Sequence, residues 1–211
     1  MNKNNTLKIR PYISVANSKL GMAIPTVNLP YGTTCRKDAP CFKECYANKG
    51  RMKYKNFVNC ASENLDAYNQ NPELYFQVID NHLEMIHFKF FRWHSSGDIP
   101  NIQYLHLMCK LARKHKQTQF LCFTKKYEIV NNYLESKKRI PKNLVIVFSN
   151  WGDWICPNPY NLPTAWVELK GQTCLIPNTA NECSGYCGEC CNTNSSCWKL
   201  KKGESVVFKQ H

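Results

Sequence analysis

The stretch Phe88-Lys-Phe-Phe-Arg-Trp-His-Ser-Ser-Gly-Asp98 joins an apolar run to a polar turn. The run, residues 88–93, predicts a strand, and the helical pattern of residues 101–116 follows the turn. The same succession recurs further along the chain, with strands expected at 120–124 and 143–149 and a helix at 127–136. This alternation indicates right-handed parallel crossovers, so we expect an α/β fold, either a partial (β/α) barrel or an open parallel sheet.

The segments on either side extend this pattern. Residues 20–29 are apolar and predict a first strand, although prolines interrupt the region. A helical pattern covers residues 46–70, and Asn71-Pro72 predicts the start of a further helix that runs to about residue 86. A fourth strand of the alternating series is expected at 164–169.

The length of 211 residues and the 43% hydrophobic content indicate a folded chain. We divide it into an α/β domain over residues 1–170 and a small cysteine-rich, metal-binding extension over residues 171–211, where few large apolar residues occur. The sequence has no run of about 18 apolar residues and no apolar segment behind its polar N-terminus. We therefore expect a cytoplasmic protein without membrane contact.

The sequence contains thirteen cysteines, an odd number, which suggests that some of them are metal ligands. In a reducing compartment, clustered thiols are more often metal ligands than disulfides. Cys35-x5-Cys41-x3-Cys45 places three thiols in eleven residues. Three ligands leave one position open, which in a [4Fe-4S] cluster can bind substrate or cofactor, whereas zinc would need a fourth ligand.

A second group of cysteines lies near the end of the chain. Cys187-Gly-Glu-Cys190 resembles a metal knuckle, and neighbouring cysteines can complete four ligands. The sequence leaves open whether iron or zinc is bound there and which four of the six residues are ligands. The six candidates are Cys174, Cys183, Cys187, Cys190, Cys191 and Cys197.

Polar residues follow three of the expected strands, and in parallel α/β folds ligands bind beyond the carboxyl ends of strands. We therefore expect these turns and the loop of Cys35 to Cys45 to share one rim. The expected catalytic residues are His94, Asp98 and Asp153. The expected cofactor-binding residues are Tyr46, Ser96, Gly97, Asp98, Thr124 and Ser149.

The net charge of +13 favours an anionic partner, either nucleic acid or an acidic protein. Metal-bound thiolates would lower this charge by several units.

The cysteine triad after a first strand, the alternating strands and helices, and the C-terminal cysteines together resemble the radical S-adenosylmethionine enzymes that carry an auxiliary iron–sulfur site. The resemblance implies that Cys35, Cys41 and Cys45 hold a catalytic [4Fe-4S] cluster, with a second cluster in the extension. It also implies S-adenosylmethionine as cofactor, Ser96-Gly97-Asp98 near its amino group, and flavodoxin or ferredoxin as electron donor. The spacing here departs from the usual C-x3-C-x2-C of that family.

A closer similarity is to the bacteriophage gene product 88 family. It rests on Cys41-x3-Cys45-Tyr-Ala followed by Gly50 and Arg51, on the Ser-Gly-Asp turn, and on Cys-Gly-x-Cys with a later Cys-Trp. This similarity implies a protein of phage or mobile-element type.

Three functions therefore remain open. The first is an iron–sulfur enzyme that cleaves S-adenosylmethionine and acts on an unknown substrate. The second is a zinc-stabilised module that binds nucleic acid or protein. The third is a non-catalytic iron–sulfur redox or sensor protein.

Overall fold

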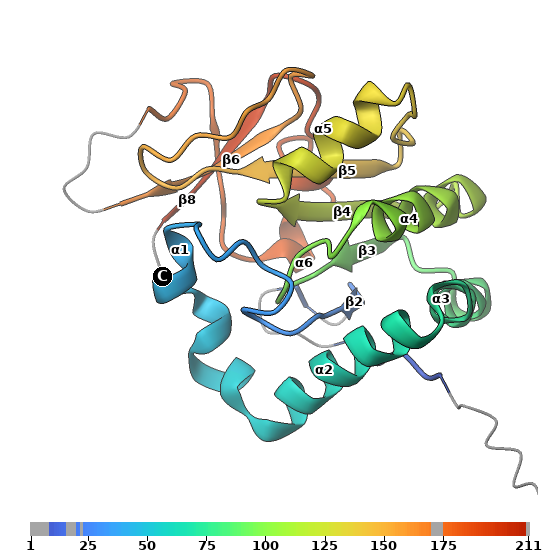
Figure 1. Cartoon of the computed structure of the whole chain (residues 1–211). Coiled ribbons are helices and arrows are strands. Elements are labelled where there is room, and N and C mark those ends of the chain that lie inside the picture. Colours follow the sequence, from blue (N-terminus) through green and yellow to red (C-terminus); the bar gives the residue numbers. More distant parts are fainter. Residues whose placement is uncertain (1–8, 16–19, 22, 170–174, 210–211) are drawn as a thin grey trace, which may run out of the picture.

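The computed structural model describes residues 9–15, 20–21, 23–169 and 175–209, which form an open, mostly parallel sheet with the long helices on one face (Figure 1). The strand order is β1-β2-β3-β4-β5-β6-β8-β7, and β1 alone among these strands runs antiparallel to its neighbour. The strands are β1 (Ile13–Ser14), β2 (Thr26–Val27), β3 (Phe90–Trp93), β4 (Gln119–Thr124), β5 (Leu144–Ser149), β6 (Thr164–Glu168), β7 (Asn181–Glu182) and β8 (Ser205–Lys209).

Helices connect the strands, and local sequence sets where the long ones begin. The side chain of Asn71 accepts a hydrogen bond from Leu74 N at 3.0 Å, and Asn101 accepts one from Tyr104 N at 2.9 Å, so both asparagines act as N-caps. The α-helices are α1 (Cys41–Glu44), α2 (Lys55–Gln70), α3 (Pro72–Ile86), α4 (Ile102–Lys114), α5 (Tyr127–Glu135) and α6 (Cys187–Cys190), and the 3-10 helices are η1 (Tyr46–Asn48), η2 (Gly50–Lys53) and η3 (Cys197–Lys199).

Alternating side chains of the central strands supply two cores, one on each face of the sheet. Phe91 and Trp93 of β3 pack into an aromatic core under α2 to α5, whereas Phe90 points to the other face. There Trp198, 1% exposed, meets the Phe90 ring edge-on with the centroids 5.2 Å apart. The cysteine-rich segment therefore covers the face that the long helices leave open.

The central part of the fold confirms the predictions from sequence. The elements α3, α4 and α5 and strands β3 to β6 lie where the apolar periodicity placed them. Of the two predicted architectures, the structure has the open parallel sheet, and no closed barrel forms within the described residues. The cysteine-rich C-terminal region is present, and it contributes β7 and β8 to the same sheet. The division at residue 170 stays a prediction.

Two predictions near the N-terminus were wrong in extent. The first parallel strand is β2, only Thr26–Val27, rather than residues 20–29, since Pro25 and Pro30 bound this short segment. The helix expected over 46–70 is broken into η1, η2 and α2. The first break lies at Gly50, whose φ of +54° is in the left-handed region, and the second lies at Tyr54, whose backbone is extended with a ψ of 136°. In the described part of the chain, no helix is both long and apolar enough to cross a membrane.

Gly97 brings the turn after β3 against the segment after β2. Its φ is +80°, and a Cβ atom there would lie 2.7 Å from both Cβ and the carbonyl oxygen of Leu29. The Leu29 N–H also donates to the Ser96 carbonyl at 3.0 Å. Residue 97 therefore has to be glycine, both for its backbone conformation and for this close approach.

We expect Gly97→Ala to lower the free energy of unfolding by at least about 2 kcal/mol, because backbone strain and overpacking against Leu29 add. The matched control is Gly185→Ala, since Gly185 has a φ of +86° but no atom within 4 Å of the place that an added methyl group would take. Urea unfolding followed by circular dichroism measures both. Equal losses in the two variants would show that contact with Leu29 adds nothing.

Candidate functional site

A cavity of about 670 Å³ lies at the carboxyl ends of the parallel strands, and both groups of cysteines line it. Its size is within the range of about 300–1,000 Å³ that is typical of small-molecule and cofactor sites. The strand-end turns expected from the sequence contribute His94 to Asp98, Thr124 and Ser149 to its lining. The predicted shared rim is therefore present in the structure.

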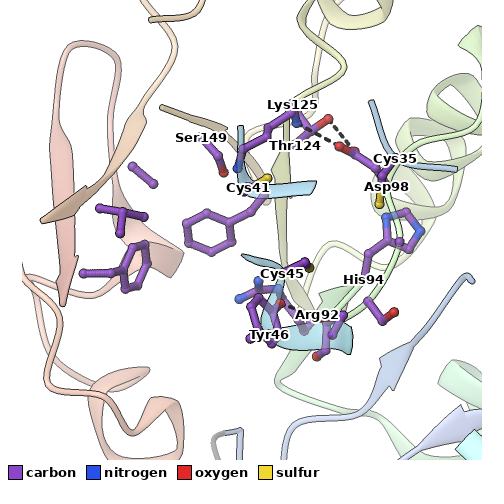
Figure 2. A pocket seen from close by; sticks show the side chains of 18 of the residues that line it. Cys35, Cys41, Cys45, Tyr46, Arg92, His94, Asp98, Thr124, Lys125 and Ser149 are labelled. Carbon is purple, nitrogen blue, oxygen red and sulfur yellow. Dashed lines mark hydrogen bonds between the residues drawn. The ribbon is translucent and has the colours of Figure 1, made fainter. Parts of the chain in front are cut away.

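Cys35, Cys41 and Cys45 approach the cavity from the loop after β2 and from α1. Figure 2 shows Cys35 beside Asp98 and His94, and Cys45 beside Tyr46 and Arg92. Burial raises the pKa of the Cys35 thiol to about 11, and the neighbouring Asp98 carboxylate and the other two thiols contribute to the shift. The three sulfurs are thus close enough to influence one another.

The second group of thiols reaches the same cavity from the segment that covers the other face of the sheet. Cys183, Cys187, Cys190 and Cys197 line the cavity. Burial raises the pKa of Cys197 to about 12, and the other three thiols add to the shift.

Cys191 differs from these four residues. It is buried in the core beneath the segment, and its thiol lies 3.5 Å from the Gly188 carbonyl. The predicted ligand Cys174 lies outside the described residues. Among the described candidates, four thiols therefore face the cavity and one does not.

Sulfur is the donor that iron–sulfur clusters and structural zinc prefer, so the donor chemistry of both groups fits a metal. Within the part of the chain that the structure describes, however, no three His, Cys, Asp or Glu side chains are arranged to hold a single metal ion.

His94 stands at the end of β3 in a left-handed backbone conformation, with a φ of 56°. Its Nε2 lies 3.1 Å from the Tyr104 hydroxyl, whereas its buried Nδ1 has no hydrogen-bond partner among the described residues. Burial lowers the pKa of His94 to about 3, and Arg92 adds to this effect. The ring is therefore neutral at physiological pH.

Two further cavity residues have buried polar atoms without a partner in the described part of the chain. These atoms are Ser96 Oγ and Asn150 Nδ2. Unsatisfied buried groups are costly, and native proteins usually pair them with protein, water or ligand. With His94 Nδ1, three residues of the cavity wall carry such an atom, and each of these atoms is enclosed by protein with almost no surface exposed to the cavity.

Asp98 uses its carboxylate inside the protein. Oδ1 accepts hydrogen bonds from Thr124 Oγ1 at 2.6 Å and Ile99 N at 2.7 Å, and Oδ2 accepts one from Lys125 N at 2.8 Å (Figure 2). The Asp98 N–H donates to Thr34 Oγ1 at 2.9 Å. This arrangement makes Asp98 a positioning residue that joins three loops, and its predicted catalytic role stays a prediction.

The remaining predicted residues fall into two groups. The Tyr46 hydroxyl donates a hydrogen bond to the Ser95 carbonyl at 2.5 Å, which holds Tyr46 against the rim of the cavity. Ser149 lines the cavity, and its carbonyl accepts a hydrogen bond from Tyr127. Asp153 is exposed and does not line the cavity. The structure thus does not bring Asp153 to the other site residues, and its role stays a prediction.

Arg92, Lys125 and Asn150 also line the cavity; Lys125 and Asn150 belong to the strand-end turns predicted to share the rim, whereas sequence reasoning did not single out Arg92. The Arg92 guanidinium lies over the Phe123 ring, 4.3 Å from its centroid. Arg92 is one of two charged residues, with Lys89, in the mostly apolar strand predicted at 88–93, and this is the sequence signal that could have identified it. Asn150 directly follows Ser149 at a strand end, so the same rim argument applied to it.

The sequence model described as gene product 88 matches residues 1–161, about three quarters of the chain. No curated protein and no solved structure matches. The matched region includes the Cys35 to Cys45 group and the strand-end turns, and it ends before the second group of thiols.

The neutral, buried His94 predicts a pH-dependent stability. Its pKa is lowered from 6.5 to about 3 in the folded protein, so between these values the unfolded state binds more protons and the free energy of unfolding falls as pH falls. We expect His94→Asn to remove up to about 1.4 kcal/mol per pH unit of this dependence in that window. Chemical denaturation at a series of pH values measures it, and identical slopes in wild type and variant would contradict the assignment.

Proposed function

The chain belongs to the gene product 88 family, and we propose that this member binds two iron–sulfur clusters and cleaves S-adenosylmethionine reductively. The observation that carries the proposal is the meeting of two separate thiol groups at one cavity. Three of these thiols come from the loop after the first parallel strand and four from the C-terminal segment.

The topology gives further support. Six parallel strands, β2, β3, β4, β5, β6 and β8, lie side by side in chain order, and the cysteine triad follows the first of them. This is the arrangement that the resemblance to radical S-adenosylmethionine enzymes implies. The Ser96-Gly97-Asp98 turn follows the second strand of the series, again as that resemblance implies.

The number of thiols at the cavity fits one cluster with an open iron and one fully ligated cluster, because a four-iron cluster takes up to four thiolate ligands. Cys35, Cys41 and Cys45 would hold a cluster with one open iron. Cys183, Cys187, Cys190 and Cys197 would hold a fully ligated one.

When bound, a reduced cluster of this kind supplies an electron that cleaves the sulfonium of S-adenosylmethionine to methionine and a carbon-centred radical. The residues of the chain bind and orient the sulfonium ligand. Arg92, Lys125 and the turn from His94 to Asp98 line the cavity and would lie beside the polar groups of the ligand. Phe42, Phe123 and Trp198 add apolar walls that exclude water, which protects a reactive radical.

We expect about eight irons and matching sulfide per chain after anaerobic reconstitution. Cys187→Ala is expected to lose about half of this iron, because it removes a ligand from one group only. Cys191→Ala is the matched control, since Cys191 is adjacent to Cys190 but faces the core, and it is expected to retain all of the iron. About one or two zinc ions without sulfide would contradict the proposal and favour the zinc-stabilised module.

We expect the reconstituted protein to form 5′-deoxyadenosine from S-adenosylmethionine when dithionite is supplied, and chromatography measures this product. Cys41→Ala should reduce the yield at least about a hundredfold, because the open iron is lost with its cluster. Cys109→Ala, a buried cysteine remote from the cavity lining, is the control and should keep the activity. No product from protein with intact clusters would contradict the proposed reaction.

A further inference from the structure

We propose that a basic segment at the mouth of the cavity binds single-stranded nucleic acid, and that the substrate of the site is a nucleotide within such a strand. The binding can be tested by itself, whereas the identity of the substrate rests on the proposed function. We call residues 43–55 the basic lip. It comprises the end of α1, the helices η1 and η2, and the first residue of α2.

The lip concentrates exposed positive charge. Lys43, Lys49, Arg51, Lys53 and Lys55 are all exposed, and Glu44 is the single acidic residue of this segment. Among the residues that the structure describes, none of these five cations forms an ion pair with a carboxylate. Unpaired cations along a short segment are the usual electrostatic footprint of a phosphate backbone.

Exposed aromatic rings lie among these cations. Tyr54 is 65% exposed and Tyr46 is 49% exposed. In the described part of the chain the Tyr54 ring makes no stacking or edge contact with another aromatic ring. Such rings can stack on bases, and the alternation of cations with stacking rings is typical of single-strand binding surfaces. An acidic protein could bind the positive charges of the lip, but it has no nucleobase that could stack on the Tyr54 ring.

The lip is continuous with the candidate site. Arg51 and Met52 of the lip line the cavity together with Tyr46 and with Phe57 of α2. A strand held along the lip would therefore pass the cavity that contains the thiols. Arg92 and Lys125 extend the positive charge inside the cavity, where a phosphate or a polar base edge could be bound.

The test measures binding of a fluorescent single-stranded oligonucleotide of about 15 nucleotides by anisotropy at several salt concentrations. The lip variant is Lys49→Glu/Lys53→Glu/Lys55→Glu. The control is Lys137→Glu/Lys138→Glu/Arg139→Glu, which changes the net charge equally but lies between α5 and β5, at the amino-terminal edge of the sheet.

We expect the lip variant to bind at least about tenfold more weakly and its salt slope to fall by about two, because three phosphate contacts are removed. The control is expected to stay within about threefold of wild type. Tyr54→Ala should weaken binding about tenfold, and Tyr54→Trp should restore it, because tryptophan also stacks on bases. Restoration by tryptophan would separate stacking from a general loss of structure.

Three results would overturn the inference: wild-type affinity in the lip variant, an equal loss in the control variant, or competition by polyglutamate as effective as that by unlabelled oligonucleotide. Iron content and 5′-deoxyadenosine yield of the lip variant are measured in parallel. Unchanged values with lost oligonucleotide binding support the inference. Retained oligonucleotide binding in wild type without 5′-deoxyadenosine would remove the proposed reaction but leave the binding surface.

Discussion

The arrangement of the site depends on the hydrogen bonds that Asp98 forms with its carboxylate and its backbone N–H. The carboxylate oxygens accept hydrogen bonds from Thr124 and Lys125 at the end of β4, while the Asp98 N–H donates to Thr34, just before Cys35. The residue is 6% exposed, so these donors offset the cost of burying it. Three loops that are far apart in the sequence are thereby held at one edge of the sheet, and the first of them carries the cysteine triad.

The two faces of the sheet are covered by different kinds of structure, and this difference creates the cavity. Long amphipathic helices pack on one face and fill it with aromatic side chains. The segment between β6 and β8 covers the other face with Trp198, Leu200 and short helical turns instead of a long helix. Because few large side chains are available there, the face is only partly filled, and thiols occupy the wall of the remaining space.

The sequence predicted the helices and strands that have a strong apolar periodicity, but it could not predict features of the backbone that depend on a single residue. Apolar spacing located α3, α4 and β5 because their buried positions repeat regularly. It could not locate the break at Gly50, since a positive φ depends on the tertiary path of the chain. Likewise, spacing cannot separate Cys190 from Cys191, because residues three and four positions after Cys187 both lie beside it on a helix, and only the structure shows that Cys191 is in the core while Cys190 lines the cavity.

Electrostatics links the thiols to their surroundings. Burial raises the pKa of Cys35 and of Cys197, so each thiol favours its protonated form while no cation is bound. Gathering several thiolates at one cavity requires compensating positive charge, which iron would supply directly and Arg92 and Lys125 would supply from the walls. If the clusters bind as proposed, their binding free energy also stabilises the packing of the C-terminal segment on the sheet, because the same residues serve both. Assembly of the site and completion of the fold would then be one linked process.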